Sequence, residues 1–179
     1  MTQTPHRSRK ARPASPGLIT AIEIWSGGQT GVDRAALDFA LAHGLPHGGW
    51  CPRGRRAEDG VIPERYRLRE TRTDAYAERT RLNVRDTDAT AIFASRRVLS
   101  GGTRLTREFA RELGRPVMVI TVRSDVRGAA VRLRAFLRRH HVRRLNLAGP
   151  RASEAAGLAV FVSVVLERAL AGLAPRRIK

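Results

Sequence analysis

The sequence has little of several features that define common classes of protein. It contains one cysteine, Cys51, which excludes an intrachain disulfide framework and a multi-cysteine metal cluster. Its longest apolar run, residues 155–166, contains Gly157 and Ser163 and is shorter than the ~20 residues that cross a bilayer. The histidines lack metal-ligand spacing, so no metal site is predicted. Aromatic residues make up only 5% of the chain, so the core must be mainly aliphatic. We therefore expect a cytoplasmic protein that does not contact a membrane.

Acidic residues are also scarce. The chain has 16 of them against 34 basic residues, which gives a net charge of +18. All the basic residues except Lys10 and Lys179 are arginines, a bias that genome composition explains more simply than a designed binding face. A positive body suits phosphate groups on a small anionic ligand or on nucleic acid. Association with nucleic acid is therefore an open alternative, but not the favoured one.

The length of 179 residues indicates a single domain with short tails. Residues 1–17 place Pro5, Pro13 and Pro16 among basic residues, which predicts a disordered basic arm. Residues 18–174 are predicted to form the ligand-binding domain, and residues 175–179 a basic tail.

Short β-rich runs alternate with helical stripes along that domain. Strands are predicted at residues 21–26, 45–51, 66–70, 89–94, 117–122 and 144–147. Helices are predicted at residues 31–43, 75–84, 103–113, 129–140 and 153–173. This alternation is typical of a parallel sheet that is covered on both faces. The predicted fold class is therefore α/β, a Rossmann-like, doubly wound and mainly parallel sheet with helices on both faces.

Two turns share one local design. The first strand leads into Ser26, Gly27, Gly28, Gln29, Thr30 and Gly31, and the fourth into Ser100, Gly101, Gly102 and Thr103. Glycine lets a ligand approach the main chain, and the helix N-terminus behind each turn offers free N–H groups to an anion. In a sheet of order 3-2-1-4-5-6, the first and fourth strands are neighbours at the switch point. We therefore expect both turns to face one anion-binding crevice; ordinary tight turns are the alternative.

A nicotinamide-binding signature is missing. There is no Gly-x-Gly-x-x-Gly, and Arg53, Arg55 and Arg56 stand where an acid would hold a ribose hydroxyl. This favours a ligand with more negative charge than an adenosine ribose. Residues 52–63 are predicted to be a loop, and its part 54–60 is either a lid over the crevice or a solvated surface loop.

Four longer segments carry a family resemblance. They are residues 26–38, 47–60, 79–86 and 145–151, within a match that runs from about Ile22 to the last helix. Together they resemble the putative molybdenum carrier family, which is similar to molybdenum-cofactor carriers and to lysine-decarboxylase-like nucleotide-binding Rossmannoid domains. The resemblance implies a homo-oligomer that binds molybdenum cofactor, or a related phosphorylated pterin or nucleotide. Both glycine turns would bind this ligand, and we add Arg55, Arg56 and Arg79 as cationic contacts.

Enzymatic relatives that cleave nucleoside monophosphates supply an alternative. Their second loop reads Pro-Gly-Gly-x-Gly-Thr-x-x-Glu, and residues 100–108 keep the two glycines and the glutamate, Glu108. Arg104 and Leu105 replace the Gly-Thr pair, which weakens the case for a hydrolase. We therefore expect a binding or carrier protein, with Glu108 as the candidate acid/base of the alternative. Cys51 is interpreted first as a small buried apolar residue and second as a nucleophile.

Overall fold

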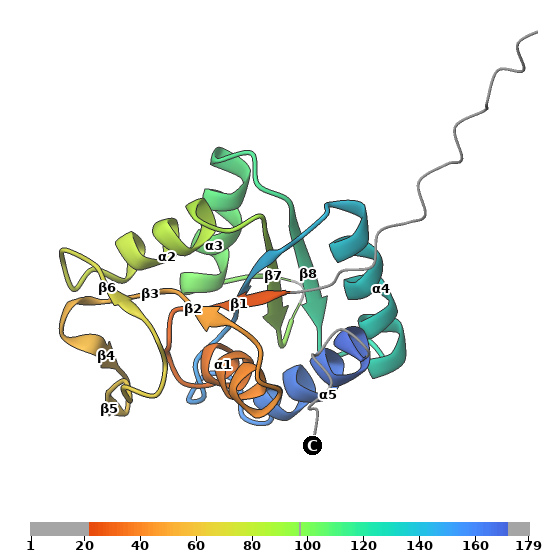
Figure 1. Ribbon diagram of the computed structural model, residues 1–179, viewed down its shortest axis with the longest axis horizontal. Helices are drawn as coiled ribbons and strands as arrows, with labels where there is room; N and C mark the ends of the chain where they lie inside the picture. Colours follow the sequence, from red (N-terminus) through yellow and green to blue (C-terminus); the bar gives the residue numbers. More distant parts are fainter. Residues whose placement is uncertain (1–21, 97, 172–179) are drawn as a thin grey trace, which may run out of the picture.

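A parallel sheet forms the centre of the molecule (Figure 1). The computed structural model describes residues 22–96 and 98–171; the predicted arm 1–17 and tail 175–179 lie outside this part. The sheet has five strands in the order β2-β1-β9-β7-β8. Their bounds are β1 (Glu23–Trp25), β2 (His47–Gly48), β7 (Ala89–Ala94), β8 (Val117–Thr121) and β9 (Arg144–Ala148). All pairings are parallel, as the sequence predicts.

Helices cover both faces of this sheet. One layer contains α1 (Val32–Ala42), α4 (Val126–Arg139) and α5 (Leu158–Leu170), and the opposite layer contains α2 (Tyr76–Arg85) and α3 (Gly101–Glu112) (Figure 1). The Rossmann-like, doubly wound α/β fold is therefore confirmed. Within residues 22–96 and 98–171, no helix combines the length and apolarity that a membrane span requires.

The core is aliphatic and follows the predicted stripes. On α1, five residues at helical spacing are all buried: Val32, Ala35, Ala36, Phe39 and Ala40. All six residues of β7 are buried, since helices cover both faces of a central parallel strand. The largest apolar cluster joins β1, β7 and β9 to α1, α4 and α5.

The predicted neighbourhood of the first and fourth strands is wrong. The last strand, β9, lies between β1 and β7, and Leu145 is paired with Ile24 on one side and with Ala89 on the other. The chain reaches this place because α4 carries it from the edge strand β8 back across β7. Three consecutive buried residues, Leu145 to Leu147, suit a central position.

Residues 49–71 leave the main sheet. The predicted strand 45–51 is split at Gly49, where φ is 141° and a Cβ would lie 2.0 Å from the carbonyl oxygen of Ser26. Beyond this point β3 (Trp50–Cys51) pairs with β6 (Arg69–Glu70) in a separate sheet. The predicted loop 52–63 contains a 3-10 turn, η1 (Arg53–Arg55), and a hairpin of β4 (Arg56–Ala57) and β5 (Gly60–Val61). A small second core of Leu37, Cys51, Ile62 and Tyr66 stabilises residues 49–71, which are called the excursion below.

Candidate functional site

The carboxyl ends of β1, β9 and β7 form the switch point of the sheet. Here α1 starts toward one face and α3 toward the other, an arrangement that leaves a crevice between them. A cavity of about 40 Å³ lies in this crevice, roughly the space of one water molecule. It is lined by residues of both turns, Gly27 and Gly102, and by Asp33, Arg79 and Asn146 among others. The two turns thus reach one crevice although β9 separates their strands.

A larger cavity of about 280 Å³ lies at the N-terminus of α3. Its lining includes Arg96, Ser100, Thr103, Pro150 and Glu154. The small cavity is lined by Gly102 and Gly149 and the large one by Thr103 and Pro150, so neighbouring residues of the same two segments line both cavities.

The main chain of the second turn is open. A Cβ built on Gly101 or Gly102 would meet no described atom within 4 Å. The hydroxyl of Thr103 donates to the carbonyl oxygen of Ser100 at 2.6 Å, and Ser100 makes no side-chain cap of α3. The accessible donors of this turn are therefore the hydroxyl of Ser100 and main-chain N–H groups at a helix N-terminus, which favour an anion.

The first turn is closed by the chain itself. Gly28 has φ of 77°, and a Cβ on it would lie 2.5 Å from Cδ1 of Leu68. A Cβ on Gly31 would lie 2.6 Å from the carbonyl oxygen of Pro150. The amide oxygen of Gln29 accepts from the main-chain N–H of Thr30 at 3.0 Å and from that of Glu58 at 2.9 Å. Both glycines therefore serve close packing within the protein.

Residues 54–60, called the lid segment or lid below, pack on the first turn. The carboxylate of Glu58 accepts from the hydroxyl of Thr30 and, at 2.5 Å, from that of Ser153. These hydrogen bonds, first from Ser153 and then from Thr30, lower the pKa of Glu58. The guanidinium of Arg34 donates to Asp59 at 2.8 Å and lowers the pKa of that carboxyl. The lid is thus held by hydrogen bonds and charge at two adjacent residues.

A buried ion pair lies at the inner end of the crevice. Nη1 of Arg79 donates to Asp33 at 2.9 Å, and only 3% of the Asp33 side chain is exposed. Burial raises the pKa of Asp33, while the guanidinium of Arg79 opposes that rise. Nε of Arg79 is also buried and has no hydrogen-bond partner among the described residues. A Cβ on Gly27 would overlap Nη1 of Arg79, so this glycine makes room for the guanidinium.

Asp33 is a site residue that the sequence did not identify. The signal was a charged residue inside the apolar stripe of α1, next to Val32 and before Ala35 and Ala36. The spacing of Thr30 and Asp33 suggests a helix cap, but α1 has no side-chain cap, and Asp33 accepts instead from the main-chain N–H of Gln29 at 3.2 Å.

Two predicted ligand arginines are not brought to the crevice. Arg55 donates to the carbonyl oxygens of Ile62 at 2.9 Å and Pro63 at 3.0 Å, and so stabilises the excursion from within. Arg56 forms an exposed ion pair with Asp74 at 2.8 Å. Neither Arg55 nor Arg56 lines a cavity of the crevice.

Glu108 and Cys51 have ordinary surroundings. Glu108 pairs with Arg104 at 2.8 Å on the exposed side of α3 and lines neither cavity of the crevice. Cys51 is buried in the small second core, where burial raises the pKa of its thiol, as fits a small apolar residue. Across residues 22–96 and 98–171, no cluster of three His, Cys, Asp or Glu side chains is placed to hold a metal ion.

Comparison with known proteins decides the family. The model of the circularly permutated YpsA SLOG family matches residues 24–170. The chain belongs to this family. A crystal structure of a putative molybdenum carrier protein from Syntrophus aciditrophicus is 43% identical, with a TM-score of 0.83 over 85% of this chain and 96% of that one. No curated protein matches the sequence.

These matches confirm the family resemblance seen in the four sequence segments. The description of the YpsA SLOG family as circularly permutated also agrees with the sheet. A permutation moves an element from one end of the chain to the other without moving it in space, and the last strand, β9, lies at the centre of the sheet.

Proposed function

We propose that this chain is a molybdenum carrier that holds a phosphate-bearing pterin, or a related nucleotide-like molecule, at the second glycine turn. The likeness to a solved protein that is named a putative molybdenum carrier supports the carrier class. The observation that carries the choice of site is that the second turn lines both cavities, with Gly102 at the small one and Ser100 and Thr103 at the large one, and that a Cβ on Gly101 or Gly102 would meet open space.

The chemistry of this place suits a phosphate. The N-terminus of α3 offers N–H groups and the positive end of the helix dipole, and Arg96 adds a cation at the cavity wall. Glu154 also lines the cavity, but it pairs with Arg151 at 3.0 Å, which offsets its charge. At about 280 Å³ the larger cavity is near the lower limit of typical ligand pockets, so a phosphate with part of a ring system fits it.

The first turn has a supporting role in this proposal. Its residues Gly28, Gln29, Thr30 and Gly31 pack against the chain, and the hydroxyl of Ser26 donates to the carbonyl oxygen of Leu147 at 2.6 Å. Gly27 and Arg79 remain at the inner end of the crevice, where the guanidinium pairs with Asp33 and adds positive charge behind the second turn. We further propose that the carrier acts in the cytoplasm as a homo-oligomer.

Ligand binding is tested by thermal unfolding with GMP, AMP, inorganic phosphate and molybdate as probes. A bound probe at one hundred times its Kd should raise Tm by about 5–10 °C. Gly102→Val should abolish this shift because its side chain would fill the open approach to the main chain. Native mass spectrometry of the purified protein, with elemental analysis for molybdenum, tests for a retained pterin and counts the subunits.

A matched pair of variants separates the site from general charge. Arg96→Gln removes a cation at the cavity wall, while Arg111→Gln removes one from the last turn of the same helix. The proposal fails if both variants weaken binding equally, or if no probe binds and the purified protein retains neither pterin nor molybdenum. Release of free base from AMP that is lost in Glu108→Gln would instead favour the hydrolase.

A further inference from the structure

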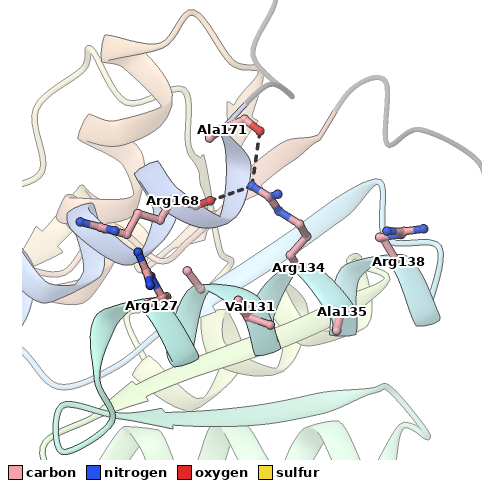
Figure 2. A pocket seen from close by; sticks show the side chains of 8 residues that line it. Arg127, Val131, Arg134, Ala135, Arg138, Arg168 and Ala171 are labelled. Atoms are coloured by element: carbon pink, nitrogen blue, oxygen red, sulfur yellow. Dashed lines mark hydrogen bonds between the residues drawn. The ribbon is translucent and has the colours of Figure 1, made fainter.

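A groove lies between α4 and the end of α5, on the layer opposite to α3. Its volume is about 470 Å³, larger than either cavity of the crevice. On α4, Arg127, Val131, Arg134 and Arg138 succeed one another at helical spacing and line it together (Figure 2). The side chain of Val131 is 63% exposed. This helix therefore presents a stripe in which an apolar floor is flanked by cations.

One of these arginines has a structural task. Arg134 donates to the carbonyl oxygens of Arg168 at 2.7 Å and Ala171 at 3.4 Å (Figure 2), and its Nε donates to that of Ala169 at 2.9 Å. It thus binds the orphan carbonyls at the C-terminus of α5, where a cation is favourable. Its guanidinium is fixed by these bonds, and its stem forms part of the wall.

Among the described residues, the other three guanidinium groups have no carboxylate partner. Within the described chain, Arg127, Arg138 and Arg168 form no ion pair. The acids next to the groove in sequence are engaged elsewhere. Asp125 accepts from the main-chain N–H of Gly128 at 2.7 Å as the cap of α4, and Glu167 lies 3.1 Å from Nε2 of His43.

The two ends of the chain outside the described residues contain no acidic side chain. All 16 acidic residues lie between Glu23 and Glu167, so residues 1–21 and 172–179 contribute none. Residues 172–179, which continue from the edge of the groove, add Arg176, Arg177 and Lys179. A second copy would bring another chain of net charge +18. Charge complementarity therefore favours an acidic molecule, rather than a second copy of this chain, as the occupant of the groove.

We propose that this groove docks an acidic amphipathic helix of a partner protein. A third helix packs naturally along the furrow between two helices, with apolar residues on the floor and acids facing the flanking arginines. Val131, Ala130 and Ala135 give the floor an apolar character that phosphate groups of a nucleic acid would leave unused. The site is separate from the proposed ligand site, so the carrier could hold cargo and partner together.

The probe is a synthetic helical peptide with one row of leucines flanked by glutamates, labelled for fluorescence anisotropy. It should bind the full chain at physiological salt. Two control peptides, one with lysine for glutamate and one with serine for leucine, should each bind at least about tenfold more weakly, because each lacks one of the two complementary features. Hydrogen exchange should show protection of residues 126–139 and 158–171 by the first peptide.

Variants of the chain locate the peptide. Arg127→Gln with Arg138→Gln should weaken binding about tenfold, and Val131→Ser about threefold. The matched double variant is Arg132→Gln with Arg139→Gln, which removes the same charge from exposed positions of α4 outside the groove. It should change binding by less than about twofold, since screening limits the reach of surface charges. Arg134 is left intact because it caps α5.

Three results would overturn the proposal. The first is equal binding of the acidic peptide and the serine control, which would make the attraction one of charge alone. The second is an equal loss in the matched double variant. The third is a DNA duplex that competes with the peptide and binds more tightly, since the groove would then be a phosphate-binding surface.

Discussion

The two glycine turns have similar sequences, but the main chain of the first is covered and that of the second is open. Each follows the carboxyl end of a strand of the main sheet, β1 or β7, and each leads into a helix. The first turn is covered by residues 54–60 and packed against Ile62 and Leu68, whereas a Cβ on Gly101 or Gly102 of the second turn would meet nothing described within 4 Å. A glycine pair thus serves internal packing in one place and access in the other. The difference arises from the later course of the chain, because β2 leads into a long excursion that folds back onto the first turn.

The largest expected effect comes from the closed turn. Gly31 adopts φ 75° and ψ −124°, a conformation available mainly to glycine, and its Cβ position lies against the main chain of Pro150 and Ala152. Gly31→Ala should therefore lower the free energy of unfolding by about 3 kcal/mol. Urea denaturation measures this loss. A loss below about 1 kcal/mol would mean that the turn relaxes easily, and the contrast between the turns would weaken.

The second effect concerns the buried ion pair that joins the first turn to α2. Arg79→Gln leaves Asp33 buried without its cation, and should cost about 2 kcal/mol at neutral pH. Burial already raises the pKa of Asp33 above its usual 3.8, and loss of Arg79 should raise it further. A carboxyl with a raised pKa favours the folded state below its unfolded pKa, and this contribution is lost as the pH rises through the folded pKa.

The pH dependence makes this prediction specific. The difference in unfolding free energy between wild type and Arg79→Gln should be largest at neutral pH and should shrink as the pH falls toward 4. The matched control is Arg81→Gln on the same helix, which removes an exposed pair with Glu112 and should cost less than about 0.5 kcal/mol. A difference that is constant with pH would show that Asp33 does not titrate in response to Arg79.

The alternation of strands and helices was enough to predict the fold, because each element buries its own stripe. Val32, Ala35 and Phe39 pack as their spacing indicates. The order of strands was not predictable from that pattern, since β9 would look the same at any central position. A circularly permuted chain breaks the usual relation between sequence order and place in the sheet.

The convergence of the two turns was predicted from the sequence, whereas the contacts of their side chains were not. The convergence of both turns agrees with the rule that ligands bind at the carboxyl ends of strands. The roles of Arg55 and Asp33 have no such rule behind them, because Arg55 binds carbonyl groups of a loop whose path no periodicity encodes. The burial of Asp33 depends on Arg79, which lies 46 residues away in sequence. Contacts of this kind become visible only when the packing of distant segments is known.

In contrast to a substitution in the first turn, a substitution in the open second turn should stabilise the protein. Gly102 lies in the first turn of α3 and has room for a side chain, so Gly102→Ala should raise the free energy of unfolding by about 0.5–1 kcal/mol. Thermal unfolding measures the gain. The same change would also narrow the approach to the main chain, so binding of GMP or phosphate should weaken while stability rises. A variant that is less stable than wild type would show that the second turn is packed in solution as the first one is.

The smallest effect on global stability is expected from a substitution in the lid. Glu58→Gln weakens the acceptor that holds Thr30 and Ser153, so hydrogen exchange of residues 54–61 should speed up at neutral pH while the thermal midpoint hardly moves. The pKa of Glu58 is lowered from its usual 4.5, so its contribution is present above that pH and lost as the pH falls through the lowered pKa. In acid, the hydrogen-exchange rate of the lid in the wild-type protein should therefore approach that in Glu58→Gln.

The control is Glu64→Gln, which changes an exposed acid within residues 49–71 and should leave hydrogen exchange of the lid unchanged. Any pH dependence that persists in Glu58→Gln reports the neighbouring pair of Arg34 and Asp59, whose carboxyl also has a lowered pKa. If exchange is the same in both variants, Arg34 and Asp59 hold the lid without Glu58, and the closure of the first turn rests on packing against Leu68 and Ile62.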